Sequence, residues 1–224
     1  MRLVTPLPRA AAAAGLALVL GAGLSACSDD STPSPAPEQP STSAAAPPPS
    51  LADLDTATLV VPRTGFCAEV PEEAVTAALG TEAVESDAYG NGEQAELTGD
   101  LTDVAHEWSC RWRSEERGTA RVWVFAPPVT VERAGELADA LAARADDSSC
   151  RTLRQPSFGD PGAAVLCRTG PTRQLLRVGL FGDAWVTCQL TLARDVAGGE
   201  LVERSDAWCA AVLETARASV ATEA

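Results

Sequence analysis

The spacing of apolar residues predicts two kinds of element after residue 51. An apolar residue at every second position is typical of a strand with one buried face, whereas a spacing of three to four is typical of an amphipathic helix. Strands are therefore expected at 107–113, 120–125, 163–168, 173–181 and 184–192. Helices are expected at 71–79, 130–145 and 199–220. This mixture predicts an α+β domain, in which about three helices pack on one face of an antiparallel sheet of about five strands.

Two segments of the chain resemble each other and predict a pair of pseudo-repeated hairpins. Cys110-Arg111 precedes Arg121-Val122-Trp123-Val124-Phe125, and Cys167-Arg168 precedes Arg177-Val178-Gly179-Leu180-Phe181. In each copy the first strand carries Cys-Arg, and the second carries Arg-Val, any residue, an aliphatic residue and Phe. Internal duplication and a chance likeness between two amphipathic hairpins both explain this pattern.

Alternation within these strands predicts a surface of arginine and aromatic side chains. If the helices cover the side that bears Val122, Val124, Val178 and Leu180, seven residues lie on the opposite side. These are Arg121, Trp123, Phe125, Arg173, Arg177, Phe181 and Trp185, with Ser109, Arg111 and Arg113 as further candidates. Arginine beside aromatic rings can hold a small anionic or aromatic ligand. The alternative is an ordinary solvated face, with the aromatic residues lying beneath residues 81–107.

Residues 81–107 are rich in acidic residues and predict a long, solvated surface loop, with a binding role as the alternative. Gly90-Asn91-Gly92 within it is a turn signal. Its carboxylates do not have the spacing of a calcium-binding loop. His106 is the only histidine, and we expect it at a strand edge, partly exposed and without a catalytic role. We therefore predict no catalytic residue, no metal, no cofactor and no enzymatic activity.

Six of the seven cysteines lie in the expected domain and predict three disulfides. They are Cys67, Cys110, Cys150, Cys167, Cys188 and Cys209. Fifteen pairings are possible in principle. If the hairpins are equivalent, Cys110 and Cys167 each bond to an upstream cysteine, which gives Cys67–Cys110 and Cys150–Cys167. Cys188 and Cys209 remain, and both lie on apolar faces that can meet.

The first residues predict export. Arg2 and Arg9 precede an apolar run at 10–24 that is too short for a comfortable membrane span but typical of a secretory signal. The run ends in Leu24-Ser25-Ala26-Cys27, which resembles the bacterial lipobox. That resemblance implies that the chain is cut before Cys27 and that the Cys27 thiol receives a diacylglycerol. The alternative is a plain secretory signal.

Residues 28–50 are rich in Pro, Ser, Thr and Ala, and lack large apolar residues. Such a composition predicts a disordered, extended tether. The sequence thus predicts a lipoprotein signal peptide at 1–26, a lipidated cysteine with its tether at 27–50, and a single α+β domain at 51–224. A Pro-rich ligand for a partner protein is the alternative for the tether.

Several of these features occur together in a known group of proteins. They are Leu24-Ser25-Ala26-Cys27, the Pro/Ser tether, Cys67 before a short helix that ends at Leu79-Gly80, and Cys110-Arg111-Trp112. In these features the chain resembles exported actinobacterial lipoproteins that carry a small cysteine-bonded α+β domain of unknown function. It has a looser similarity to the extracellular sensor domains of mycobacterial receptor kinases. Neither resemblance implies a catalytic residue.

Composition narrows the function further. The formal net charge is −14, from 17 basic residues, all arginine, and 31 acidic residues. So acidic a chain is repelled by phosphate backbones, which argues against nucleic-acid binding. We expect a lipid-anchored cell-envelope protein on the extracytoplasmic side, acting as a ligand-binding or accessory module. Its expected partners are the membrane, an envelope protein or a small anionic or aromatic ligand. The alternatives are an envelope-acting hydrolase and a structural or surface antigen without a small ligand.

Overall fold

The computed structural model describes residues 49–98, 101–146, 148–154 and 157–222. Every described residue belongs to one compact unit. The expected signal peptide, Cys27 and all of the expected tether except Pro49 and Ser50 lie outside the described residues.

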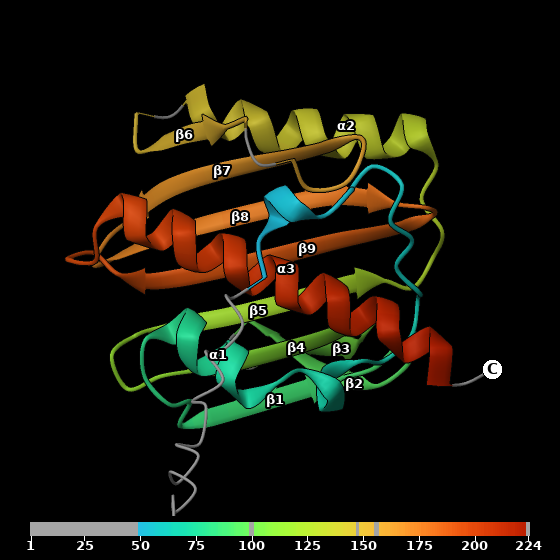
Figure 1. Ribbon diagram of the computed structural model, residues 1–224, viewed down its shortest axis with the longest axis horizontal. Coiled ribbons are helices and arrows are strands. Elements are labelled where there is room, and N and C mark those ends of the chain that lie inside the picture. Colours follow the sequence, from blue (N-terminus) through green and yellow to red (C-terminus); the bar gives the residue numbers. More distant parts are fainter. Residues whose placement is uncertain (1–48, 99–100, 147, 155–156, 223–224) are drawn as a thin grey trace, which may run out of the picture. The chain divides into compact units, whose positions relative to one another are not determined.

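Nine described strands form two sheets, so the α+β prediction is confirmed and the prediction of about five strands is wrong (Figure 1). The large sheet has the order β1-β4-β5-β9-β8-β7-β6, and each neighbouring pair is antiparallel. The strands are β1 (Glu85–Tyr89), β4 (Glu107–Arg113), β5 (Thr119–Phe125), β6 (Cys150–Leu153), β7 (Gly162–Thr169), β8 (Thr172–Phe181) and β9 (Ala184–Ala193). A separate hairpin consists of β2 (Gln94–Thr98) and β3 (Leu101–Val104).

The expected acidic loop at 81–107 is the main source of the extra strands. It contains β1, β2 and β3, and Gly92 has φ 89° within the turn between β1 and β2. The prediction failed because β1 is a short edge strand of mostly polar residues and β6 is an edge strand of only four residues, so neither has a clear buried face in the sequence.

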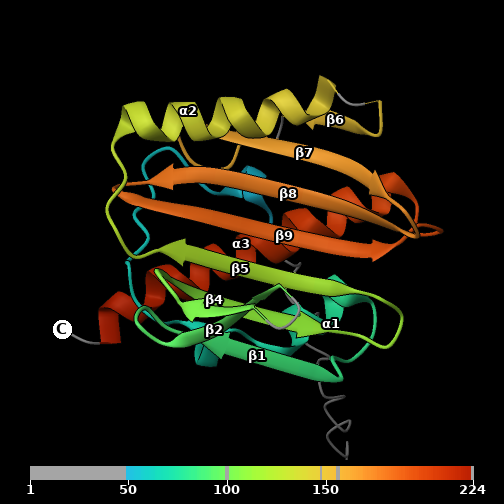
Figure 2. The same ribbon diagram turned by 180° about the vertical axis from the view of Figure 1, so that it is seen from behind.

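Three α-helices cover the two faces of the large sheet within the described residues, so packing on one face only is wrong. They are α1 (Glu72–Leu79), α2 (Val131–Ala142) and α3 (Gly198–Thr222), accompanied by the short helices η1 (Leu51–Asp53), η2 (Cys67–Glu69) and η3 (Ala143–Asp146). Helices α1 and α3 lie in front of the sheet in Figure 1, whereas α2 lies on the side that faces the viewer in Figure 2. We call these sides the α3 face and the α2 face.

Each face has its own hydrophobic core. The α3 face carries Val122, Val124, Cys188 and Leu190, which pack with the buried side of α3 around Trp208. The α2 face carries Val165, Val178, Leu180 and Trp185, which pack with Ala134, Ala138 and Leu141 of α2. Thr130 caps α2 by accepting a hydrogen bond from the backbone N–H of Arg133, and Gly80 ends α1 with φ 80°.

The repeated hairpins belong to two larger units with the same order of elements. The first contains α1, β1, β4 and β5, and the second contains α2, β6, β7 and β8. They lie on either side of β9, with β5 and β8 parallel to each other, and their helices cover opposite faces. A half-turn about an axis along β9 therefore relates the two units. Such a rotation preserves strand direction and exchanges the two faces of the sheet.

Three disulfides link the elements, in the pairing that the sequence predicts. Cys67–Cys110 joins η2 to β4, Cys150–Cys167 joins β6 to β7, and Cys188–Cys209 joins β9 to α3. Disulfides form and persist in oxidising compartments, which indicates an extracytoplasmic location for this domain. Among the described helices, none has the length and apolar character needed to cross a bilayer.

Candidate functional site

The seven residues of the expected arginine–aromatic surface do not share one face. Arg121, Trp123, Phe125 and Trp185 lie on the α2 face, as their register along β5 and β9 requires. Arg173, Arg177 and Phe181 lie on the α3 face, on the same side of β8 as the core residue Leu175. The prediction failed because it placed equivalent residues of the two hairpins on the same side, whereas the half-turn along β9 places them on opposite sides.

Three of the seven are buried and cannot contribute a binding surface. Arg177 and Phe181 are 0% exposed, and Trp185 is 3% exposed. Phe181 packs edge-on against Phe158, with their ring centroids 5.0 Å apart. Burial lowers the pKa of the Arg177 guanidinium, and the nearby Asp206 carboxylate opposes this by raising it. These side chains therefore belong to the interior of the domain.

The arginines of the first unit that lie on the α2 face are paired with carboxylates. Arg113 binds Glu85 at 2.6 Å, Arg111 binds Asp87 at 2.8 Å, and Arg121 binds Glu107 at 3.1 Å. These pairs form a ladder across β1, β4 and β5. The carboxylates of the ladder neutralise the arginine charges that were expected, from the sequence, to bind an anionic ligand. A simple anion site at Arg121 is therefore not supported.

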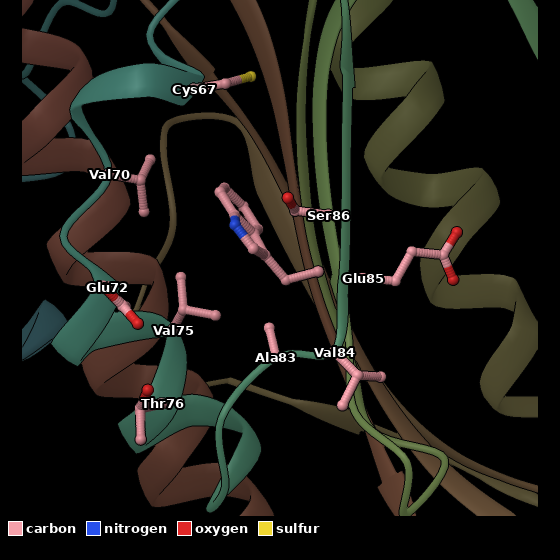
Figure 3. Close-up of a pocket in the computed structure, with 10 residues that line it drawn as sticks. Cys67, Val70, Glu72, Val75, Thr76, Ala83, Val84, Glu85 and Ser86 are labelled. Atoms are coloured by element: carbon pink, nitrogen blue, oxygen red, sulfur yellow. The ribbon is translucent and has the colours of Figure 1, made fainter.

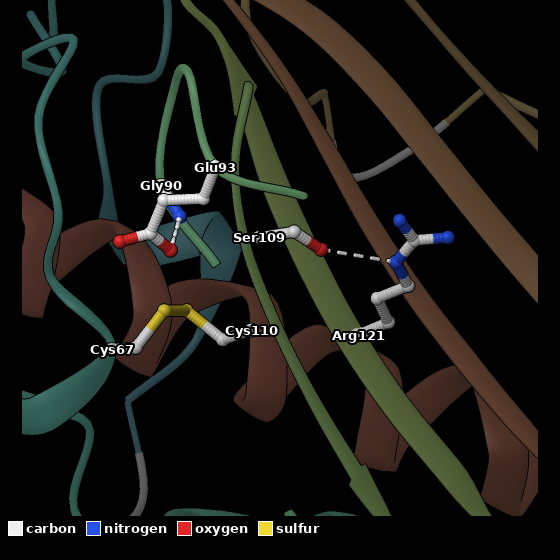
Figure 4. The surroundings of a disulfide bond; sticks show 6 residues. All are labelled: Cys67, Gly90, Glu93, Ser109, Cys110 and Arg121. Carbon is white, nitrogen blue, oxygen red and sulfur yellow. Dashed lines mark hydrogen bonds between the residues drawn. A yellow bond between two sulfur atoms is a disulfide. The ribbon is translucent and has the colours of Figure 1, made fainter. Parts of the chain in front are cut away.

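Arg121 is the centre of a polar network that includes Tyr89, the only tyrosine of the chain. The Tyr89 hydroxyl donates to Glu107 Oε1 at 2.6 Å and accepts from Arg121 Nη2 at 2.8 Å. Arg121 Nε also donates to Ser109 Oγ at 3.1 Å (Figure 4). The Arg121 and Glu107 side chains are only 28% and 20% exposed. Their geometry is thus fixed by several bonds at once.

Burial raises the pKa of the Tyr89 phenol above its ordinary value of 10.0, and the hydrogen bond to the Glu107 carboxylate raises it further. The hydrogen bond with Ser109 and the charge of Arg121 act in the opposite direction. Because the pKa is raised in the folded state, the folded domain holds this proton more tightly than the unfolded chain. The stability that the protonated Tyr89 phenol contributes is therefore fully present below pH 10 and is lost as the pH rises through the folded pKa.

This network lines a cavity of about 290 Å³, which we call the hairpin cleft. The β2–β3 hairpin lies on the α2 face beside β4, as Figure 2 shows, and the residues after β3 form one wall of the cleft. Its lining residues are Asp87, Tyr89, Asp103, Val104, Ala105, His106, Glu107, Arg111 and Arg121. His106 is exposed at the start of β4, as expected for its position. The cleft thus combines a phenol, two guanidinium groups, an imidazole and three carboxylates.

Trp123 lies next to the network on β5. The Arg121 guanidinium carbon is 4.4 Å from the centre of the Trp123 ring, within the range of a cation–π interaction. Trp123 is half-buried, and Phe125 beyond it packs at the edge of the α2 core. Of the expected aromatic residues, Trp123 therefore lies nearest to the cleft chemistry.

A second cavity of about 280 Å³ lies on the α3 face, between α1 and the edge strand β1. Figure 3 shows Val70 and Val75 on the helix side facing Ala83 and Ser86 on the strand side, with Glu85 pointing away. The Cys67–Cys110 disulfide borders it and crosses to β4 (Figure 4). Its few polar groups do not form a network like that of the hairpin cleft, so the hairpin cleft is the stronger candidate.

Sequence reasoning did not identify Tyr89 as a site residue, and it named Asp87 and Glu107 only as part of the acidic stretch at 81–107. A signal was present, because β1 carries acidic residues at alternate positions and β4 carries arginines at alternate positions. Recognising it required knowing that β1 is a strand that pairs with β4. Among the described residues, no group of three or more His, Cys, Asp or Glu side chains is arranged to hold a metal ion.

No family model matches this chain, and no curated protein matches it. The resemblance to actinobacterial lipoproteins remains a prediction, and the function must be argued from the site.

Proposed function

We propose that this protein is a lipid-anchored binding or accessory module of the cell envelope, and that it binds its ligand in the hairpin cleft. The lipobox-like Leu24-Ser25-Ala26-Cys27 and the Pro-rich segment after it support the anchor. The three disulfides support the extracytoplasmic side of the membrane. The two acyl chains of a diacylglycerol anchor a protein stably, whereas a single acyl chain binds the membrane only weakly and reversibly.

The observation that carries the binding site is the Arg121–Tyr89–Glu107 network at the wall of a cavity. A cavity with a few fixed, convergent polar groups is the usual form of a small-molecule site. Because the guanidinium groups are already paired with carboxylates, the cleft favours a ligand that offers both donors and acceptors. A hydroxyl-rich polar molecule has this character, and the Trp123 ring beside the cleft adds an apolar contact.

The network also argues for binding over catalysis. The Glu107 Oε1 atom accepts hydrogen bonds from both Tyr89 and Arg121, so it is already engaged within the protein. A general base needs a carboxylate that is available to take a proton from the substrate. The envelope-acting hydrolase is therefore the weaker of the two proposals.

The test compares two arginines of the same ladder, one inside the cleft and one outside it. Arg121→Gln removes the three hydrogen bonds that Arg121 donates in the network, to Ser109, Tyr89 and Glu107, whereas Arg113→Gln removes the exposed pair with Glu85. We expect molecules that co-purify with the protein from its own envelope to be retained by wild type and Arg113→Gln. Loss of a charged hydrogen bond should reduce occupancy in Arg121→Gln about tenfold or more. Native mass spectrometry measures this occupancy directly.

A ligand retained equally by both variants would place the site elsewhere. Because Tyr89 is the only tyrosine, its absorbance titration reports on the cleft alone. Addition of the co-purified ligand should shift this titration in wild type and not in Arg121→Gln. A ligand that binds without disturbing the Tyr89 titration would also contradict the proposal.

A further inference from the structure

A third cavity, of about 360 Å³, lies at the opposite end of the sheet, on the α3 face. Three arginines line it, one from each of the three strands at the β6 end of the sheet: Arg151 of β6, Arg168 of β7 and Arg173 of β8. Ser148, Ser149, Cys150, Leu166 and Gly198 complete the lining. We call it the arginine cleft. Among the residues that the structure describes, no carboxylate lines this cleft, although the protein as a whole carries a net charge of −14.

The register of the strands forces the three guanidinium groups together. Arg168 and Arg173 are direct partners across the β7–β8 pair, and Arg151 lies opposite Leu166 on the neighbouring strand β6. All three side chains leave the sheet on the α3 face, as do their strand neighbours Leu153, Leu166 and Leu175. Like charges in directly opposed positions repel each other and destabilise a strand pair. An anion between them removes that cost.

The contacts of these arginines within the described residues leave their charge uncompensated. Arg168 Nη2 donates to the carbonyl of Ser148 at 3.4 Å, and Arg173 Nη1 donates to the carbonyl of Val196. In the part of the chain that the structure describes, none of the three forms an ion pair with a carboxylate. In the charge ladder of the first unit, by contrast, each arginine forms an ion pair with a carboxylate.

The start of α3 adds to the positive potential of the cleft. Gly198 is the first residue of this 25-residue helix, and a Cβ built on it would lie 3.8 Å from Arg173 Nη1. The first backbone N–H groups of a helix carry a partial positive charge. Glu200, the acidic residue in this turn, is bound to Arg204 at 3.0 Å. It therefore does not neutralise the arginine cleft.

We propose that the arginine cleft binds a phosphate group. Guanidinium groups bind phosphate oxygens through paired, charge-assisted hydrogen bonds. Three positive charges match a phosphate dianion better than they match a singly charged carboxylate. Arg151 and Arg168 are exposed, so a ligand can reach them. The Ser148 hydroxyl, in the lining of the cleft, offers a further donor. The site lies on the opposite face from the hairpin cleft and is independent of it.

Inorganic phosphate is the probe, and the full chain is the protein used. The variant Arg151→Gln/Arg168→Gln removes two exposed charges of the cleft without touching the core. The matched control Arg133→Gln/Arg217→Gln removes two exposed charges elsewhere, on α2 and α3. Calorimetry should show saturable phosphate binding to wild type and to the control. In the cleft variant we expect the affinity to fall about tenfold or more, since two charged hydrogen-bond donors are lost.

Absence of saturable binding to wild type would overturn the proposal, as would equal affinity in the cleft variant and the control. Vesicles distinguish the source of the phosphate group. If the group belongs to a lipid headgroup, the full chain should bind vesicles containing phosphatidylglycerol more strongly than pure phosphatidylcholine, and the cleft variant should lose this preference. Phosphate binding without such a preference assigns the site to a soluble phosphorylated molecule. The Arg121→Gln variant, which we expect to lose the hairpin-cleft ligand, should bind inorganic phosphate with the same affinity as wild type.

Discussion

Replacement of Cys188 and Cys209 by alanine is expected to lower the free energy of unfolding by about 4 kcal/mol. The disulfide closes a sequence separation of 21 residues, which contributes about 3 kcal/mol in the chain-entropy model. Both cysteines are 0% exposed, between the central strand β9 and α3, so the missing sulfur atoms also leave a cavity in the core. A cavity of this size adds about 1 kcal/mol.

Urea unfolding without reductant measures this loss. The matched control is Cys150→Ala/Cys167→Ala, whose sequence separation of 17 gives nearly the same entropic contribution. That bond joins two strands that are already paired at the edge of the sheet, and Cys150 is only half-buried. We therefore expect about 3 kcal/mol for the control pair. If the loss of stability for the Cys188–Cys209 pair were equal to or smaller than that for the control, the position of this disulfide in the core between β9 and α3 would be contradicted.

Gly179→Ala is expected to destabilise the domain by about 3 kcal/mol, because it places a methyl group where another segment of backbone lies. A Cβ on Gly179 would collide with the carbonyl oxygen of Phe158 and lie 2.7 Å from its carbonyl carbon and 2.9 Å from Gly159 Cα. Neither neighbour is a flexible side-chain end that can move aside. Insertion of a methyl group into such a contact costs about 1–3 kcal/mol, and we expect the upper end.

Gly135→Ala is the matched control for this substitution. Gly135 lies inside α2, and a Cβ on it would have nothing within 4 Å. Alanine favours a helix interior over glycine by about 1 kcal/mol, so this variant should be more stable than wild type. Thermal and urea unfolding of both variants measure the difference of about 4 kcal/mol. Similar stabilities for the two variants would mean that the 158–159 segment does not lie against β8.

The same glycine explains why the two hairpins diverge. Trp123 and Gly179 occupy equivalent positions in the two sequence copies. In the first unit this position is open enough for an indole ring, which Arg121 covers. In the second unit the backbone of Phe158 and Gly159 crosses the strand at this point, so no side chain fits. The residue at this position in each hairpin therefore fits what lies above it.

Much of the fold could be predicted from the sequence, because it depends on local patterns. The strands at 107–113, 173–181 and 184–192 alternate clearly, and the structure has β4, β8 and β9 there. The disulfide pairing followed from the likeness of the hairpins and from the apolar faces of β9 and α3. The edge strands β1 and β6 could not be predicted in this way, because an edge strand need not have a buried face.

The candidate site depends on contacts that the sequence does not contain. The likeness of Arg121 and Arg177 indicates equivalent positions within two units, but not how the units are related. The half-turn along β9 leaves Arg121 partly exposed on one face and buries Arg177 on the other. The pairing of β6, β7 and β8 within the second unit brings Arg151, Arg168 and Arg173 to one end of the α3 face. Neither the strand register nor the relation between the two units is visible in the sequence.

The most direct test of the membrane-anchored, extracytoplasmic assignment is the mass of the native protein recovered from the membrane fraction, after alkylation without reductant. We predict a chain that begins at Cys27, carries a diacylglycerol on that residue, and has six cysteines that do not react. The same protein with Cys27→Ala should leave the membrane fraction. A native chain without acylation, or with alkylated cysteines in the domain, would contradict the assignment.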